Sequence, residues 1–167
     1  GVATFPSGTF TIGGSLTNTG SILSNSGTVT LNSSDTGETI SLGSSSLHNL
    51  TFNSSTGGWT ITSSATTTGT TTLTSVGQFT LNPGLTLAVG SAFQHTAVGA
   101  STTWTGSTLS LESGSYSVNL KSSSLEAYGT LRVKANAHIA TWNATATAYD
   151  ISSTGSLYSQ DHFGVDG

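Results

Sequence analysis

The stretches TVTL (28–31), NLTF (49–52) and TTTL (70–73) decide the fold, because each begins 21 residues after the one before it. In the first two, polar and apolar side chains alternate, and this period of two predicts a strand with one buried face. Further apolar residues recur every 20 to 22 positions: Ile40, Ile61 and Leu81; Leu87, Leu109 and Leu131; Val89, Leu111 and Val133. Such a constant spacing indicates a repeat protein in which each repeat covers the apolar face of its neighbour.

These patterns predict a single all-β domain over residues 1–167. We expect a right-handed parallel β-helix, or β-solenoid, with 20–22 residues in each coil, since parallel crossovers are right-handed. The alternative is an antiparallel β-sandwich. Its hairpins would favour Asn-Gly or Asp-Gly turns, and neither dipeptide occurs before Asp166-Gly167. The repeated spacing and the missing hairpin turns therefore favour the solenoid.

The composition excludes several classes of partner. Ser and Thr make up 62 of the 167 residues, whereas 6% are charged and only three are basic. With a net charge of −4 we expect no nucleic acid, whose phosphates require clustered Lys and Arg. We also expect no membrane insertion, because no apolar run approaches the roughly 18 residues of a spanning helix. The absence of cysteine excludes disulfides and thiolate metal sites, and we predict no cofactor.

A series of T/N-x-T triplets is the main candidate for a ligand-binding surface. The series starts at Thr9 and Thr11, and its candidate outward face consists of Thr28, Thr30, Asn49, Thr51, Thr70 and Thr72. A flat hydroxyl array of this kind is typical of ice-binding solenoids. One further step of 21 residues places Ser91 and Phe93 in the two rows, so we expect the array to stop there. The interpretation we favour is an ordinary exposed β face, because Thr has a high strand propensity.

Thr71 is an exception within the alternating pattern. By its phase it points inward, at the position that Val29 and Leu50 occupy one and two repeats earlier. A buried hydroxyl needs a hydrogen-bond partner. The sequence therefore predicts a buried polar contact at Thr71.

Aromatic residues suggest a second kind of surface, a platform on which sugar rings stack. Trp59 alternates in phase with Ile61, which predicts a core position. Trp104 has no apolar neighbour two residues away on either side, so it is the best candidate for an exposed aromatic residue. Together with the Thr rows, Trp104 would make a carbohydrate-binding module the alternative to a purely structural role.

The acidic residues are scattered and do not form a recognisable active site, so we predict no catalytic residue and no metal ligand. Glu112 and Lys134 are separated by about one repeat, and we expect them to pair across adjacent coils. A cation site at Asp150, Asp161 and His162 stays open. A polysaccharide-degrading solenoid, the least favoured function, would need clustered carboxylates, for which the chain offers Glu112, Glu126, Asp150 and Asp161.

A short unit of glycine, any residue, an apolar residue, Thr and an apolar residue recurs along the chain, as GTFTI (8–12), GTVTL (27–31) and GQFTL (77–81), with GTLRV (129–133) as a variant. With this unit and the segment 138–164, the chain resembles the repetitive Ser/Thr/Gly-rich surface proteins of bacteria, which are adhesin-like and haemagglutinin-like β-solenoids.

The resemblance implies an extracellular or cell-surface, non-catalytic segment of a longer exported protein, acting as a spacer or adhesin. The expected partners are neighbouring domains of the same parent chain, another copy joined end to end, and a glycan or other surface ligand.

Overall fold

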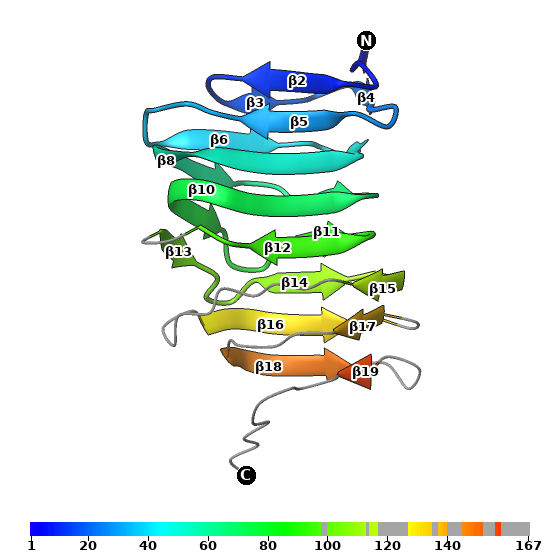
Figure 1. Ribbon diagram of the computed structural model, residues 1–167, viewed down its shortest axis with the longest axis vertical. Coiled ribbons are helices and arrows are strands. Elements are labelled where there is room, and N and C mark those ends of the chain that lie inside the picture. The colour runs from blue at the N-terminus through cyan, green and yellow to red at the C-terminus, as the bar shows by residue number, and fades with distance from the viewer. Residues whose placement is uncertain are drawn as a thin grey trace.

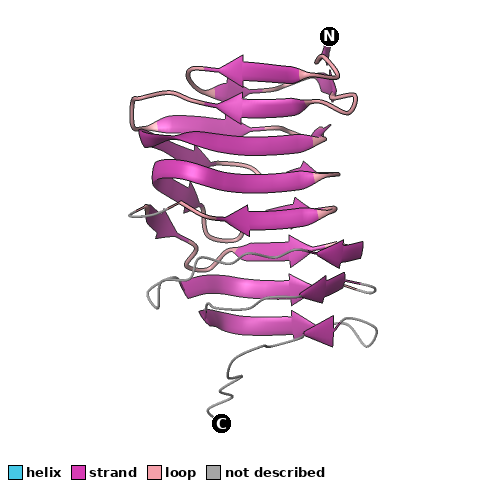
Figure 2. Cartoon of the chain, viewed as in Figure 1, coloured by secondary structure: helices cyan, strands magenta, loops and turns pink. Residues whose placement is uncertain are grey.

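The computed structural model describes residues 1–97, 100–112, 114–116, 127–134, 137–139, 145–151 and 156–157. These residues form strands, turns and loops without any helix, and the strands are stacked along one long axis (Figures 1 and 2). Every strand pair in this part of the chain is parallel. The predicted parallel β-solenoid is therefore confirmed, and the antiparallel sandwich is wrong.

The solenoid has three faces, and the chain visits them in the same cyclic order in each coil. The first face contains β2 (Thr9–Ile12), β5 (Thr28–Leu31), the first half of β8 (Asn49–Ile61), the first half of β10 (Thr70–Leu81) and β12 (Ala92–His95). The second face contains β3 (Leu16–Thr17), β6 (Glu38–Ser41), the second halves of β8 and β10, and β13 (Ser101–Thr103).

The third face contains the longest ladder. It consists of β7 (Ser46–Leu47), β9 (Ala65–Thr67), β11 (Thr86–Val89), β14 (Thr108–Leu111), β16 (Ala127–Val133) and β18 (Thr145–Ile151). At the N-terminal end, β1 (Val2–Thr4) pairs with β4 (Ser21–Leu23), and β4 lies beside β7. Towards the C-terminal end, β15 (Gly114–Tyr116), β17 (Ala137–Ile139) and β19 (Ser156–Leu157) form a further three-stranded sheet.

The register confirms the spacing read from the sequence. Phe52 is paired with Leu31 on one side and with Leu73 on the other, so residues one repeat apart in the sequence lie directly opposite each other. Leu109 on the third face is paired in the same way with the leucines one repeat before and after it. The coil is shorter between β2 and β5 and between β16 and β18. Strand pairing fixes the register within each face, so changes in coil length are absorbed at the corners.

The core is a continuous set of apolar columns inside the three faces. Leu31, Phe52 and Leu73 are completely buried, as are Ile40 and Ile61 on the second face. Aromatic rings fill the centre of several coils, and they meet edge to face or tilted, as aromatic pairs prefer. Their contacts run from Trp59 to Phe52, from Phe52 to Phe79, from Phe79 to Trp104 and from Trp104 to Tyr128. This column of rings extends over coils far apart in the sequence.

Polar contacts also lie within this apolar interior. The hydroxyls of Thr67 and Thr71 are 2.8 Å apart, and both residues are fully buried. The predicted buried partner of Thr71 is therefore confirmed as Thr67. Further along the axis, Nδ1 of the buried His95 lies 3.1 Å from the hydroxyl of Tyr128.

Candidate ligand face

The six predicted triplet residues lie together on the first face, in two columns. Thr30, Thr51 and Thr72 are paired in one column, and Thr28 is paired with Asn49 in the other. Thr70 follows Asn49 in the same register, because the adjacent Thr71 is paired with Leu50. All six side chains are half-buried and point away from the core. Residues two apart on a strand are separated by about 6.7 Å, and adjacent coils by about 4.8 Å. The columns therefore form a regular grid, as the spacing predicts.

The grid continues beyond the residue at which we expected it to stop, although its chemistry changes. Thr70 is paired with Ala92 and Thr72 with Gln94, so Ser91 and Phe93 are not the next members of the rows. The coil between β10 and β12 is longer by a single residue than the coil between β8 and β10. Phe93 consequently points inward and is buried. The rows continue in register, but they lose their hydroxyls at β12.

Polar groups of this face bind the coils to one another. The Asn49 amide donates a hydrogen bond to Oγ1 of Thr28 at 3.3 Å. Its Oδ1 accepts a hydrogen bond from the backbone N–H of Thr70 at 2.8 Å. The Asn49 side chain thus bridges three coils in succession. At this position the grid therefore helps to hold the coils together.

Hydroxyl columns also occur on the other two faces, which the sequence reasoning missed. Thr39, Thr60, Thr80 and Thr103 are paired along the second face, and Thr86, Thr108 and Thr130 along the third. The sequence indicates these columns too, because their Thr residues recur at the same spacing of about one coil as the apolar residues do. Because all three faces carry such columns, a hydroxyl column alone does not set the first face apart from the others.

Trp104 corrects a prediction, because it is not on the surface. Only 2% of the residue is exposed. Its ring centroid lies 4.8 Å from that of Phe79 and 4.8 Å from that of Tyr128, with Phe93 at 6.0 Å. Phe79 and Tyr128 come from neighbouring coils and Phe93 from another face of the same coil, so the absence of an apolar residue two positions away gave the wrong answer. Trp59 is buried as well, as predicted.

Three charged side chains, those of Glu38, Glu112 and Lys134, make local contacts. Nζ of Lys134 lies 2.6 Å from Oε2 of Glu112, which confirms the predicted pair between adjacent coils. Glu38 accepts hydrogen bonds from the hydroxyls of Ser15 at 2.5 Å and Ser33 at 3.4 Å. Within the described residues, no three His, Cys, Asp or Glu side chains gather where they could hold a metal ion. The side chains of Glu126, Asp150, Asp161 and His162 lie outside the described residues, and so does Trp142.

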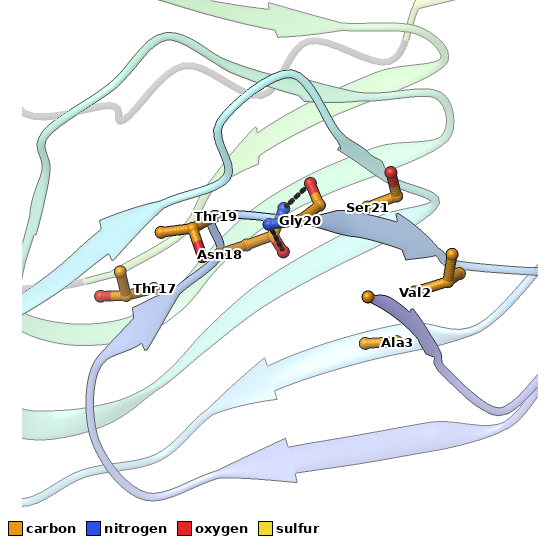
Figure 3. A pocket seen from close by; sticks show the side chains of 8 residues that line it. Val2, Ala3, Thr17, Asn18, Thr19, Gly20 and Ser21 are labelled. Carbon is orange, nitrogen blue, oxygen red and sulfur yellow. Dashed lines mark hydrogen bonds between the residues drawn. The ribbon is translucent and has the colours of Figure 1, made fainter.

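A shallow hollow opens at the N-terminal end of the solenoid (Figure 3). It is lined by Gly1, Val2, Ala3 and residues 17–21. The Asn18 side chain stabilises the corner between β3 and β4. Its amide nitrogen donates to the carbonyls of Gly20 at 3.0 Å and Leu42 at 2.9 Å, and its Oδ1 accepts from the Gly20 N–H at 3.1 Å. The polar groups of Asn18 thus stabilise the corner, and no Asp, Glu, His, Lys or Arg side chain lines the hollow.

Nothing in the described part of the chain forms a helix of the length and hydrophobicity needed to cross a bilayer. Comparison with protein-family models, with curated proteins and with solved structures gives no match in any of the three cases.

Proposed function

We propose that the chain is a non-catalytic structural segment, a rigid spacer of an extracellular or cell-surface protein. The observation that carries the proposal is the repetition of one pattern on all three faces, with hydroxyl columns outside and apolar columns inside. The outward side chains therefore belong to strands whose pairing stacks one coil on the next. Such a segment would set the distance between the neighbouring parts of its parent chain.

The surface chemistry supports placement outside the cell. A fold with so few charges remains hydrated through Ser and Thr hydroxyls, which do not depend on pH or on counterions. The resemblance to repetitive bacterial surface proteins points in the same direction. An adhesive role is the second candidate, and the observation in its favour is that hydroxyl columns face outward along every side.

The spacer proposal predicts a rigid rod whose length follows the number of coils. Because the chain contains no cysteine, spin labels can be placed at two introduced cysteines alone. We would label Thr17→Cys on β3 and Thr103→Cys on β13, two exposed positions of the second face that lie four coils apart. Their separation along the axis is about 19 Å at about 4.8 Å per coil.

Double electron–electron resonance should give one narrow distance distribution for this pair. A broad distribution would contradict a rigid spacer.

A glycan array and a polysaccharide hydrolysis assay on the unmodified chain address the other functions. Specific binding to one glycan would favour the adhesive role, and turnover of a polysaccharide would refute the non-catalytic assignment.

A further inference from the structure

One of the apolar columns inside the first face contains a histidine. The column consists of Ile12, Leu31, Phe52 and Leu73, which are paired in succession, and Leu73 is paired with His95. His95 is only 1% exposed, so its ring points into the core as the leucine of the preceding coil does. Of these five paired residues, His95 is the one whose side chain gains or loses a charge near neutral pH.

Aromatic side chains surround His95. The ring of Phe93, on the same strand β12, meets the imidazole edge to face, with the two centroids 6.5 Å apart. The hydroxyl of Tyr128 on β16 lies 3.1 Å from Nδ1 of His95, and Tyr128 is completely buried. The Tyr128 ring packs in turn against Trp104. The contact between His95 and Tyr128 therefore joins the first face to the third across the interior, from one coil to the next.

The described groups that face His95 carry no charge. β10, which is paired with β12, contains no titratable residue, and on β16 the group facing the imidazole is the phenol of Tyr128. β15 carries Tyr116, whose side chain lies outside the described residues. The described charged side chains of β16 and of the turns beside it lie on the outward side: Arg132, Glu112 and Lys134. A phenol is neutral at the pH at which histidine titrates.

This environment suits a neutral imidazole better than a charged one. Moving a charge from water into an apolar interior is costly unless an opposite charge compensates for it. The phenol of Tyr128 exchanges a hydrogen bond with the imidazole but brings no negative charge. The Phe93 ring lies beyond the reach of about 6 Å at which a cation–π contact would help. Protonation of His95 is therefore favoured by an opening of the coil that lets water reach the ring.

We propose that His95 makes this coil an acid-sensitive switch, which is closed at neutral pH and opens locally as the pH falls below about 6.5. The open state binds one proton more than the closed state, so the closed state has its full stability above the ordinary pKa of histidine and loses it below that value. The rod would then be stiff in neutral surroundings and hinged at β12 in acidic ones. The inference does not rest on the spacer function, because a rod without the switch would still be a spacer.

Amide hydrogen exchange at about pH 7.5 and about pH 5.5 tests the switch, since these values lie on either side of the ordinary pKa of histidine. The reporters are the N–H groups of Thr96 and Ala97, which follow His95 and donate to the Leu73 carbonyl at 3.0 and 2.9 Å. After correction for the intrinsic pH dependence of exchange, their protection should fall about tenfold at the lower pH, through proton uptake by the opened coil. The reference is the N–H of Thr62, which donates to the Ile40 carbonyl at 2.9 Å and should keep its protection.

Three variants assign the response to His95. His95→Leu places in the column the residue that it has one coil earlier, and it should abolish the loss of protection. His95→Leu combined with Tyr128→Phe replaces both polar groups by apolar ones, so that no hydroxyl loses a partner. His48→Gln is the matched control, because His48 is half-buried at a corner, with its Nδ1 3.0 Å from the Thr68 hydroxyl. This control should keep the tenfold response, and circular dichroism at both pH values shows that each variant keeps its fold.

Any of three results would overturn the proposal. Unchanged protection of Thr96 and Ala97 would show that acid does not open this coil. A response that persists in His95→Leu and in the double variant would belong to another group. An equal loss of protection at Thr62 would show that acid weakens the whole rod. A loss confined to the reporters, retained in His48→Gln and removed by His95→Leu, would support the switch.

Discussion

The buried Thr67–Thr71 pair gives a prediction whose magnitude follows from the structure. The two hydroxyls are 2.8 Å apart, and both residues are fully buried. Along the axis, Thr71 lies between Leu50 and Phe93, so apolar side chains occupy the same column in both neighbouring coils. Replacing Thr71 by Val removes one hydroxyl and leaves the Thr67 hydroxyl buried without its partner. Such a group costs about 1–3 kcal/mol in the free energy of unfolding.

The reciprocal change Thr67→Val should cost a similar amount, because it leaves the Thr71 hydroxyl without its partner. The double variant removes both hydroxyls and adds two methyl groups to an apolar environment. Replacing both partners by apolar groups of the same shape is nearly neutral or stabilising. The double variant should therefore be more stable than either single variant. If it is neutral, the coupling energy from the double-mutant cycle equals the sum of the two single costs, about 2–6 kcal/mol.

Urea unfolding followed by circular dichroism measures these differences. At a slope of about 2 kcal/mol per molar urea, each single variant should unfold at roughly 0.5–1.5 M less urea than the unmodified chain. Thr72→Val is the matched control, since Thr72 is adjacent but outward and half-buried, and it should change stability by less than about 0.5 kcal/mol. Additive effects of the two single variants would show that the hydroxyls do not interact and would refute the reasoning.

Three further predictions concern residues outside this pair. Trp104→Ala should lower the free energy of unfolding by about 3–5 kcal/mol in the same urea assay, because it empties a buried aromatic site; unchanged stability would contradict its burial. Lys134→Ala should cost no more than about 1 kcal/mol, since its pair with Glu112 lies at the surface; a larger loss would show that the pair is worth more than a surface contact. Finally, the chain should show no thermal hysteresis in ice-growth measurements, because Asn49 is bonded within the grid and the hydroxyl rows end at Ala92 and Gln94; measurable hysteresis would make the first face an ice-binding surface.

The sequence was sufficient to predict the parts of the fold that depend on spacing. Strand pairing in a solenoid converts a separation of about one coil into direct contact, so Leu31 and Phe52, or Glu112 and Lys134, can be paired by counting. The buried hydroxyl of Thr71 followed from the same count, because its column was otherwise apolar. These predictions needed no knowledge of the corners between the faces.

Two predictions, the end of the outward rows and the exposure of Trp104, failed at the corners between the faces. One extra residue before β12 moves Ala92 into the outward row and turns Phe93 inward, and no local signal marks that residue. Trp104 follows β13, and its packing partners Phe79 and Tyr128 come from the coil before it and the coil after it. Residues at i±2 lie on the same strand of one coil. Whether a side chain is buried in a solenoid depends also on the side chains that adjacent coils place against it.

Thr has the same sequence pattern whether it stacks coils or binds a ligand, and only the surroundings separate the two roles. A β-branched side chain with a hydroxyl fits an exposed strand, and it fits a hydroxyl-reading surface equally well. On this chain the second and third faces repeat the columns of the first, through residues such as Thr60 and Thr108. The presence of a hydroxyl column is therefore not sufficient to identify a ligand-binding face, and on this chain only a binding measurement separates the two roles.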